Sequence, residues 1–127
     1  MNERFRLFVY GQLRRGEIGY RQLGLENRTE WLGAARVNGL IYDLGDYPGL
    51  VIGGEDIAHG ELLGFDDPAL WAILDDYEEC DPDSSTSSEY RREEIELLDA
   101  VGCAWTYVYN RSVEQPRLIA SGAWRRA

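Results

Sequence analysis

The chain has 127 residues, of which 44% are hydrophobic and 28% charged, and it carries a formal net charge of −10 at pH 7. One hydrophobic core can be buried at this length and a second cannot, so we expect a single domain over residues 1–127. The acidic charge repels phosphate backbones and anionic lipid surfaces, which argues against nucleic-acid and membrane partners. The N-terminus lacks the continuous apolar segment of a secretion signal, and no apolar run reaches the roughly 20 residues of a membrane span, so we expect a cytoplasmic protein.

The first half of the chain is predicted to be rich in β-strands. Polar and apolar residues alternate from Arg4 to Tyr10, which favours a strand that ends at a loop over residues 11–16. Residues 17–24 favour at most a short helical turn. Two further strands, interrupted by glycine-rich segments, are predicted at Trp31–Leu44 and Val51–Phe65.

A helix is predicted from Asp67 and Pro68 to about Glu79. An aspartate oxygen can accept hydrogen bonds from the first N–H groups of a helix, and proline suits the first helical position. Apolar residues recur every three or four positions and predict a stripe that packs on a sheet. The stripe comprises Leu70, Ile73, Leu74 and Tyr77. Glu78 lies at its border, so we expect its carboxylate to face the body of the protein.

The last third of the chain is predicted to contain a loop and a β-hairpin. Residues 81–88 include no apolar side chain and are expected to form the loop. The hairpin strands are predicted at Arg92–Leu98 and Cys103–Tyr109, with a turn at residues 99–102. Strands outnumber helices, which favours an α+β domain in which a curled sheet covers the helix.

The sequence argues against several kinds of catalytic or cofactor-binding site. His59 is the only histidine, and no serine lies in a G-x-S-x-G turn, so a Ser–His–Asp triad is disfavoured. The chain contains no phosphate-binding or dinucleotide-binding glycine motif, and a metal would have to be held by carboxylates alone. We therefore expect neither a metal nor a cofactor. Cys80 and Cys103 have neither a disulfide-framework nor a zinc spacing and are expected to be free thiols.

Two segments remain as candidates for a functional site. The sequence VYGQLRRG at residues 9–16 places a glycine directly after a strand, where successive N–H groups can form an oxyanion nest. A plain strand-to-helix turn has the same pattern. In the acidic sequence at residues 75–83, Glu78 could act as a general acid or base because burial among like charges raises a carboxyl pKa. A solvated acidic cluster is the alternative, and we expect it for Asp75, Asp76 and Glu79.

The motifs resemble those of γ-glutamyl cyclotransferase-like proteins, including the AIG2-like proteins, in the same order and spacing. VYGQLRRG resembles the family's VYGTL-x-x-G loop, and LDDYE at residues 74–78 resembles its L-D-x-x-E helix end. The other matching segments are YPGL at 47–50, GEL at 60–62, YRR at 90–92, AWTY at 104–107 and SGAW at 121–124.

This resemblance implies a fold, a reaction and a set of site residues. The fold is a small mixed β-barrel with flanking helices. The reaction is the attack of a γ-glutamyl group's own α-amine on its γ-carbonyl, which releases 5-oxoproline and a free amine or amino acid without metal or cofactor. The expected partner is thus a small γ-glutamyl substrate. Glu78 matches the family's acid/base position, and Tyr10, Gly11, Gln12 and Leu13 match its substrate-binding loop. Tyr90 either lines the site with its hydroxyl or packs in the core.

Three positions depart from the family pattern and bear on the choice of substrate. Gln12 replaces threonine, Glu79 replaces a glycine, and Ala123 replaces an aspartate. A longer side chain at Gln12 and a negative charge at Glu79 should disfavour acidic leaving groups. Two other functions remain open: a catalytically silent binding module, and a biosynthetic enzyme that removes a γ-glutamyl protecting group from a larger amine.

Overall fold

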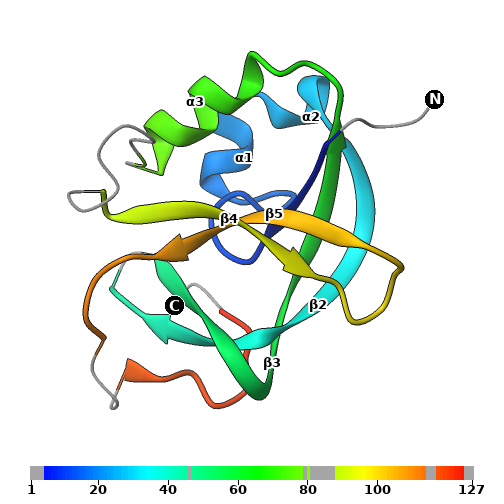
Figure 1. Cartoon of the computed structure of the whole chain (residues 1–127). Helices are drawn as coiled ribbons and strands as arrows, with labels where there is room; N and C mark the ends of the chain where they lie inside the picture. The colour runs from blue at the N-terminus through cyan, green and yellow to red at the C-terminus, as the bar shows by residue number, and fades with distance from the viewer. Residues whose placement is uncertain (1–4, 46, 79, 81–87, 114–116, 125–127) are drawn as a thin grey trace.

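The computed structural model of the protein describes residues 5–45, 47–78, 80, 88–113 and 117–124. Five strands and three short helices follow one another along these ranges: β1 Phe5–Val9, α1 Ile18–Gln22, α2 Leu25–Arg28, β2 Glu30–Asp43, β3 Pro48–Phe65, α3 Leu70–Tyr77, β4 Tyr90–Glu96 and β5 Cys103–Tyr109. The strands form one mixed sheet in the order β2-β3-β1-β5-β4, with the helices together on one side (Figure 1). The expected α+β class is therefore confirmed.

The sheet consists of two antiparallel halves that meet at one parallel pair. Strand β3 pairs with β1 and β2, and β4 pairs with β5, always antiparallel. The halves join where β1 lies parallel to β5, with Leu7 opposite Trp105. The Thr106 hydroxyl, which is fully buried, donates to the Phe8 carbonyl across this junction at 3.0 Å.

The expected β-barrel is not closed. Closure requires a continuous ladder between the two edge strands, which here are β2 and β4. The hydrogen bonds from β2 on this side go instead to the turn after β4, where the Leu98 N–H donates to the Arg36 carbonyl at 2.9 Å and the Arg36 guanidinium pairs with Asp99. Among the described residues no ladder joins β2 to β4. The sheet is thus strongly curled, with its edge strands touching at one end.

Successive side chains of the central strand β1 point to opposite faces of the sheet and belong to two different apolar clusters. Leu7 and Val9 belong to the cluster under the helices, which also contains Leu74 of α3. Phe8 belongs to the cluster on the opposite face, which Trp124 helps to cover. Because both faces of this part of β1 are covered, Leu7, Phe8 and Val9 are consecutive apolar residues.

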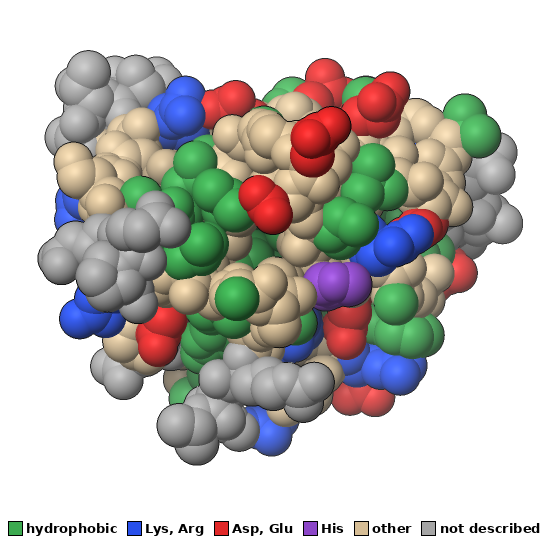
Figure 2. Space-filling view, turned by 90° about the horizontal axis from the view of Figure 1, so that it is seen from below, with side chains coloured by type: hydrophobic (Ala, Val, Ile, Leu, Met, Phe, Trp, Pro, Cys, Tyr) green, Lys and Arg blue, Asp and Glu red, His purple; other side chains and the backbone are tan. Residues whose placement is uncertain are grey.

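The structure has an exposed histidine and the two expected free thiols. His59 lies on β3 and is exposed on the face shown in Figure 2. Cys103 is an exposed free thiol, and Cys80 is a partly buried one. None of the described helices is long and apolar enough to cross a membrane.

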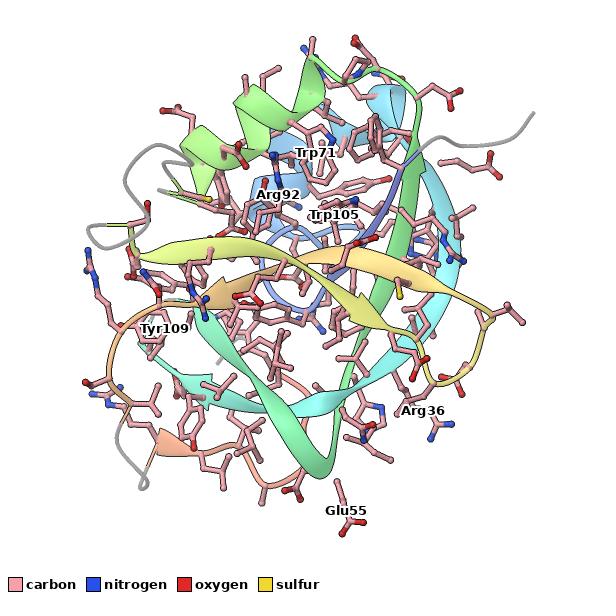
Figure 3. The ribbon with its side chains drawn as sticks, viewed as in Figure 1. Arg36, Glu55, Trp71, Arg92, Trp105 and Tyr109 are labelled. Atoms are coloured by element: carbon pink, nitrogen blue, oxygen red, sulfur yellow. The ribbon has the colours of Figure 1, made fainter. Side chains whose placement is uncertain are left out.

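The glycine-rich segment within β3 bends the strand, whereas we expected such a segment to interrupt it. The residue pairs Gly39–Ile52 and Asn38–Ile57 lie next to each other in the β2–β3 ladder, so residues 53–56 loop out as a bulge. Gly53 and Gly54 have φ angles of 123° and 75°, which favour glycine. Glu55 lies at this bend and points into solvent (Figure 3).

Strand boundaries differ by a few residues from those predicted. Strand β3 begins at Pro48, ahead of the predicted Val51, because residues 48–52 pair with the end of β2. Strand β4 begins at Tyr90, two residues before the predicted start, because Tyr90 pairs with Tyr109. Strand β5 has the predicted bounds.

The helices also differ from the prediction. Helix α3 begins at Leu70, because Pro68 opens a turn in which the Asp67 carboxylate accepts a hydrogen bond from the Ala69 N–H at 2.9 Å. It ends at Tyr77, and Glu78 is its C-cap. The four-residue helix α2 was not predicted. Its only local signal is Gly24, which has a left-handed conformation with φ of 64° immediately before it.

Candidate active site

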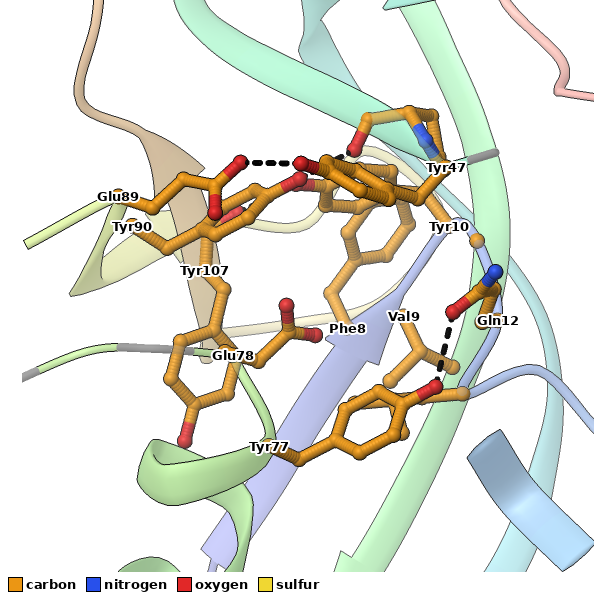
Figure 4. Close-up of a pocket in the computed structure, with 13 residues that line it drawn as sticks. Phe8, Val9, Tyr10, Gln12, Tyr47, Tyr77, Glu78, Glu89, Tyr90 and Tyr107 are labelled. Carbon is orange, nitrogen blue, oxygen red and sulfur yellow. Dashed lines mark hydrogen bonds between the residues drawn. The ribbon is translucent and has the colours of Figure 1, made fainter. Parts of the chain in front are cut away.

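A cavity of about 100 Å³ lies where the loop after β1 meets the end of α3 and the start of β4 (Figure 4). A buried water needs roughly 10–15 Å³, so the cavity has room for a small ligand group. Its lining consists of Phe8, Val9, Tyr10, Gly11, Gln12, Leu13, Tyr47, Pro48, Tyr77, Glu78, Glu89, Tyr90 and Tyr107. All six residues predicted for the site from the sequence are among them.

The loop after β1 requires glycine and supplies main-chain donors. A Cβ atom on Gly11 would lie 2.6 Å from Cγ of Pro48, so only glycine fits against this proline ring. The Gln12 carbonyl accepts a hydrogen bond from the Tyr20 N–H at 3.1 Å, which ties the loop to α1. Among the described residues, the N–H groups of Gly11 and Leu13 have no hydrogen-bond acceptor. The loop can therefore offer two main-chain donors to a ligand.

Two arginines hold the same loop in place. Arg14 donates from Nε to the Gly11 carbonyl at 3.0 Å, and its guanidinium lies 5.5 Å from the centre of a Trp124 ring. The Arg15 N–H donates to Oε1 of Glu61 at 2.7 Å. These contacts connect the loop to Glu61 on β3 and to Trp124 near the end of the described chain.

Glu78 presents a carboxylate to the cavity with a strongly perturbed acidity. Its N–H caps α3 through a bond to the Leu74 carbonyl at 3.0 Å, and its side chain is half-buried. Burial, and then the negative charge of Glu89, raise the pKa of Glu78 to about 8. A carboxyl group with this pKa can both accept and donate a proton near neutral pH.

Glu89 is a second carboxylate in the cavity, and the sequence reading missed it. It is only 8% exposed, and its Oε2 accepts a hydrogen bond from the Tyr47 hydroxyl at 2.6 Å. Its position directly before Tyr90 was the available signal, because a residue that precedes a site residue at a strand start can share its surroundings.

Five tyrosine hydroxyls around the cavity donate to protein acceptors. These are Tyr10 to the Tyr107 carbonyl (2.6 Å), Tyr47 to Glu89 (2.6 Å), Tyr77 to Oε1 of Gln12 (2.8 Å), Tyr90 to the Pro48 carbonyl (2.7 Å) and Tyr107 to Asp75 (2.7 Å). Tyr90 thus lines the cavity and also fixes the Pro48 segment. Burial raises the pKa of Tyr10, Tyr77, Tyr90 and Tyr107, so these hydroxyls keep their protons.

The expectation that Asp75 faces solvent is wrong. Asp75 is 9% exposed and accepts hydrogen bonds from the Tyr107 hydroxyl and, at 3.1 Å on both oxygens, from Nη1 of Arg92. The Arg92 guanidinium also lies over Trp71, 4.3 Å from a ring centre. A buried carboxylate is stable here because it is paired and hydrogen-bonded. Asp76, by contrast, is exposed as expected.

The three departures from the family pattern lie in different places. Gln12 lies in the cavity, where its side-chain oxygen binds the Tyr77 hydroxyl. Ala123 does not line the cavity. Glu79 and the loop predicted at residues 81–88, except Ser88, lie outside the described residues. Within the described part of the chain, no group of three His, Cys, Asp or Glu side chains is placed to hold a metal ion.

Comparisons with known proteins place the sequence and the fold in one family. The profile of the family described as "Gamma-glutamyl cyclotransferase, AIG2-like" matches residues 7–126. The chain is 33% identical over 126 residues to the gamma-glutamylcyclotransferase family protein YtfP of Escherichia coli strain K12, which covers 94% of this chain and 95% of the relative. It is 34% identical over 108 residues to the gamma-L-glutamyl-butirosin B gamma-glutamyl cyclotransferase of Niallia circulans, covering 83% of this chain and 67% of that one. The crystal structure of an AIG2-like protein from Mus musculus has the same fold, with a TM-score of 0.76, 19% identity and coverage of 98% of this chain and 90% of that one. The chain therefore belongs to the AIG2-like γ-glutamyl cyclotransferase family.

Proposed function

We propose that the protein converts a small γ-glutamyl compound into 5-oxoproline and a free amine or amino acid. The observation that carries this proposal is that Glu78 lines one cavity with Gly11 and Leu13, whose N–H groups have no acceptor among the described residues. The substrate supplies its own nucleophile, because its α-amine lies within reach of its γ-carbonyl carbon. The proposed reaction requires neither a metal nor a cofactor.

Glu78 moves two protons in turn from the α-nitrogen to the leaving nitrogen in this mechanism. It takes a proton from the α-ammonium group, and the free amine then attacks the γ-carbonyl carbon. A new C–N bond closes the five-membered ring, and the bond between the γ-carbon and the leaving nitrogen breaks. Glu78 returns the proton to the leaving nitrogen. It then takes the second proton from the ring nitrogen, which leaves 5-oxoproline as a neutral lactam, and passes this proton to the released amine. A pKa near 8 suits both steps, because neither protonation state is strongly favoured at neutral pH.

The loop after β1 stabilises the charge that develops on the γ-oxygen. The N–H groups of Gly11 and Leu13 are held by the rigid turn against Pro48, so they need not reorganise during the reaction. Loss of one such donor typically lowers kcat by about 100-fold or more.

The test is the detection of 5-oxoproline by mass spectrometry after incubation with a panel of γ-glutamyl amino acids and γ-glutamyl amines. The parent protein should form product, Glu78→Gln should not, and Asp76→Asn, which removes an exposed carboxylate from the same helix, should behave as the parent. No product from the parent across the panel would refute the proposal. Ligand binding that persists without turnover and is indifferent to Glu78→Gln would instead support a binding module.

A second candidate uses the same chemistry on a larger substrate. The Niallia circulans relative is named for action on a γ-glutamyl-butirosin, which favours a biosynthetic enzyme that removes a γ-glutamyl protecting group. Including γ-L-glutamyl-butirosin B in the panel separates the two. Higher kcat/KM for this compound than for γ-glutamyl amino acids would favour the second candidate.

A further inference from the structure

The cavity carries negative charge and no positive side chain. Of the 13 lining residues, Glu78 and Glu89 are carboxylic acids, and none is lysine, arginine or histidine. The nearby Arg92 is paired with Asp75, and Arg14 lies over Trp124. The charge of the cavity is therefore uncompensated by the residues that line it.

The hydrogen-bonding groups of the wall point to the same kind of ligand. The hydroxyl protons of Tyr10, Tyr47, Tyr77, Tyr90 and Tyr107 are all directed to protein acceptors. A hydroxyl that donates into the wall can offer a ligand only its lone pairs. Apart from the loop after β1, the cavity thus presents acceptors, which suit a ligand cation.

Glu89 is a hydrogen-bond acceptor of the cavity that can still accept a further hydrogen bond. Tyr47 occupies its Oε2, and among the described residues no donor reaches its Oε1. Glu89 is 8% exposed, so bulk water cannot fully solvate this oxygen. A buried carboxylate whose donors are incomplete is unfavourable until a further donor completes them, and a ligand cation supplies both the donor and the opposite charge.

We propose that Glu89 binds the α-ammonium group of the γ-glutamyl substrate and presents it to Glu78. This inference rests on the proposed function and adds to it a second carboxylate that contacts the substrate. Both carboxyl groups flank the same cavity, and Tyr47 holds Glu89 in place (Figure 4). The α-ammonium fits better than a cation on the leaving amine, because a cavity of about 100 Å³ has room for the γ-glutamyl end and Glu89 lies buried in its wall.

The test measures binding in the Glu78→Gln background, in which Glu89 is the only carboxylate among the described lining residues. Isothermal titration calorimetry compares three ligands: γ-glutamylethylamide, its analogue N-ethylglutaramate without the α-ammonium, and N-(2-aminoethyl)glutaramate with a cation on the leaving side only. Glu78→Gln should bind the first ligand about 10- to 100-fold more tightly than either of the others, as expected for a charge-assisted hydrogen bond.

Adding Glu89→Gln should abolish this preference and leave the affinity for N-ethylglutaramate unchanged, which shows that the cavity is intact. The matched control Glu94→Gln makes the same change at an exposed position of β4 and should keep the preference. A preference that survives Glu89→Gln, a preference for the leaving-side cation, or no preference at all would overturn the inference. Product formation by the parent reports separately on the proposed function, so the two can fail independently.

Discussion

Glu78→Gln should make the folded protein more stable in alkaline solution. Burial, and then the charge of Glu89, raise the pKa of Glu78 from 4.5 to about 8. Between these values the folded protein holds a proton that the unfolded chain has released, so the free energy of unfolding falls as the pH rises and levels off above pH 8. Glutamine has no charge to lose and avoids this penalty.

The size of this stabilisation follows from the shift in the pKa of Glu78. A pKa raised from 4.5 to about 8 corresponds to a ceiling of about 5 kcal/mol. Glu78 is half-buried at the cavity, so solvent screens part of its charge and we expect about 2 kcal/mol. For a domain of this length, Tm should rise by about 6–10 °C at pH 9.

Five other titratable groups feel the charge of Glu78, and all of them have raised pKa values. They therefore remain protonated through most of the pH range in which Glu78 titrates: Tyr10, Tyr77, Cys80, Tyr90 and Tyr107. The neighbouring residues Arg92 and Asp75 form an ion pair with each other.

Differential scanning calorimetry at pH 5 and pH 9 provides the assay. The Tm difference between Glu78→Gln and the parent should be small at pH 5, which lies just above the sequence pI of about 4.5, and large at pH 9. Asp76→Asn, an exposed change on the same helix, should show no such dependence. An equal Tm difference at both pH values would refute the reasoning, because it would mean that the Glu78 charge is well solvated in the folded state.

Three further predictions concern other residues. Glu89→Gln should move the rising limb of the kcat/KM profile for 5-oxoproline release to lower pH, because the charge of Glu89 raises the pKa of Glu78; a limb that stays in place would contradict this. Gly11→Ala should destabilise the fold by about 1–3 kcal/mol in urea unfolding, because the new methyl group collides with Pro48. Asp75→Asn should cost about 1–3 kcal/mol in the same assay, because its arginine partner loses a part-buried ion pair; Asp76→Asn, which is exposed, is the control, and equal effects of the two would contradict it.

Local sequence was sufficient for the parts of the site that lie in short continuous motifs. The loop from Tyr10 to Leu13 could be recognised because a glycine follows an alternating strand. Glu78 could be recognised because it borders the apolar stripe of α3. In both cases the decisive information lies within ten residues.

The remaining features depend on contacts between distant segments. Glu89 becomes a cavity residue only because Tyr47, 42 residues earlier, donates to it. Asp75 reads as a surface charge until Arg92 and Tyr107 are placed beside it by the hairpin. Barrel closure depends on how far the sheet curls, which no local pattern reports.

The single parallel junction between β1 and β5 determines when the site can exist during folding. The loop after β1 belongs to the half formed by β1, β2 and β3, whereas Glu89 belongs to the half formed by β4 and β5. The antiparallel pairs of each half involve only strands of that half, because β1, β2 and β3 precede α3 in the chain and β4 and β5 follow it. The two carboxylates and the loop donors come together only when the halves dock. Separation at this seam would therefore abolish the cavity while the antiparallel pairs within each half remain.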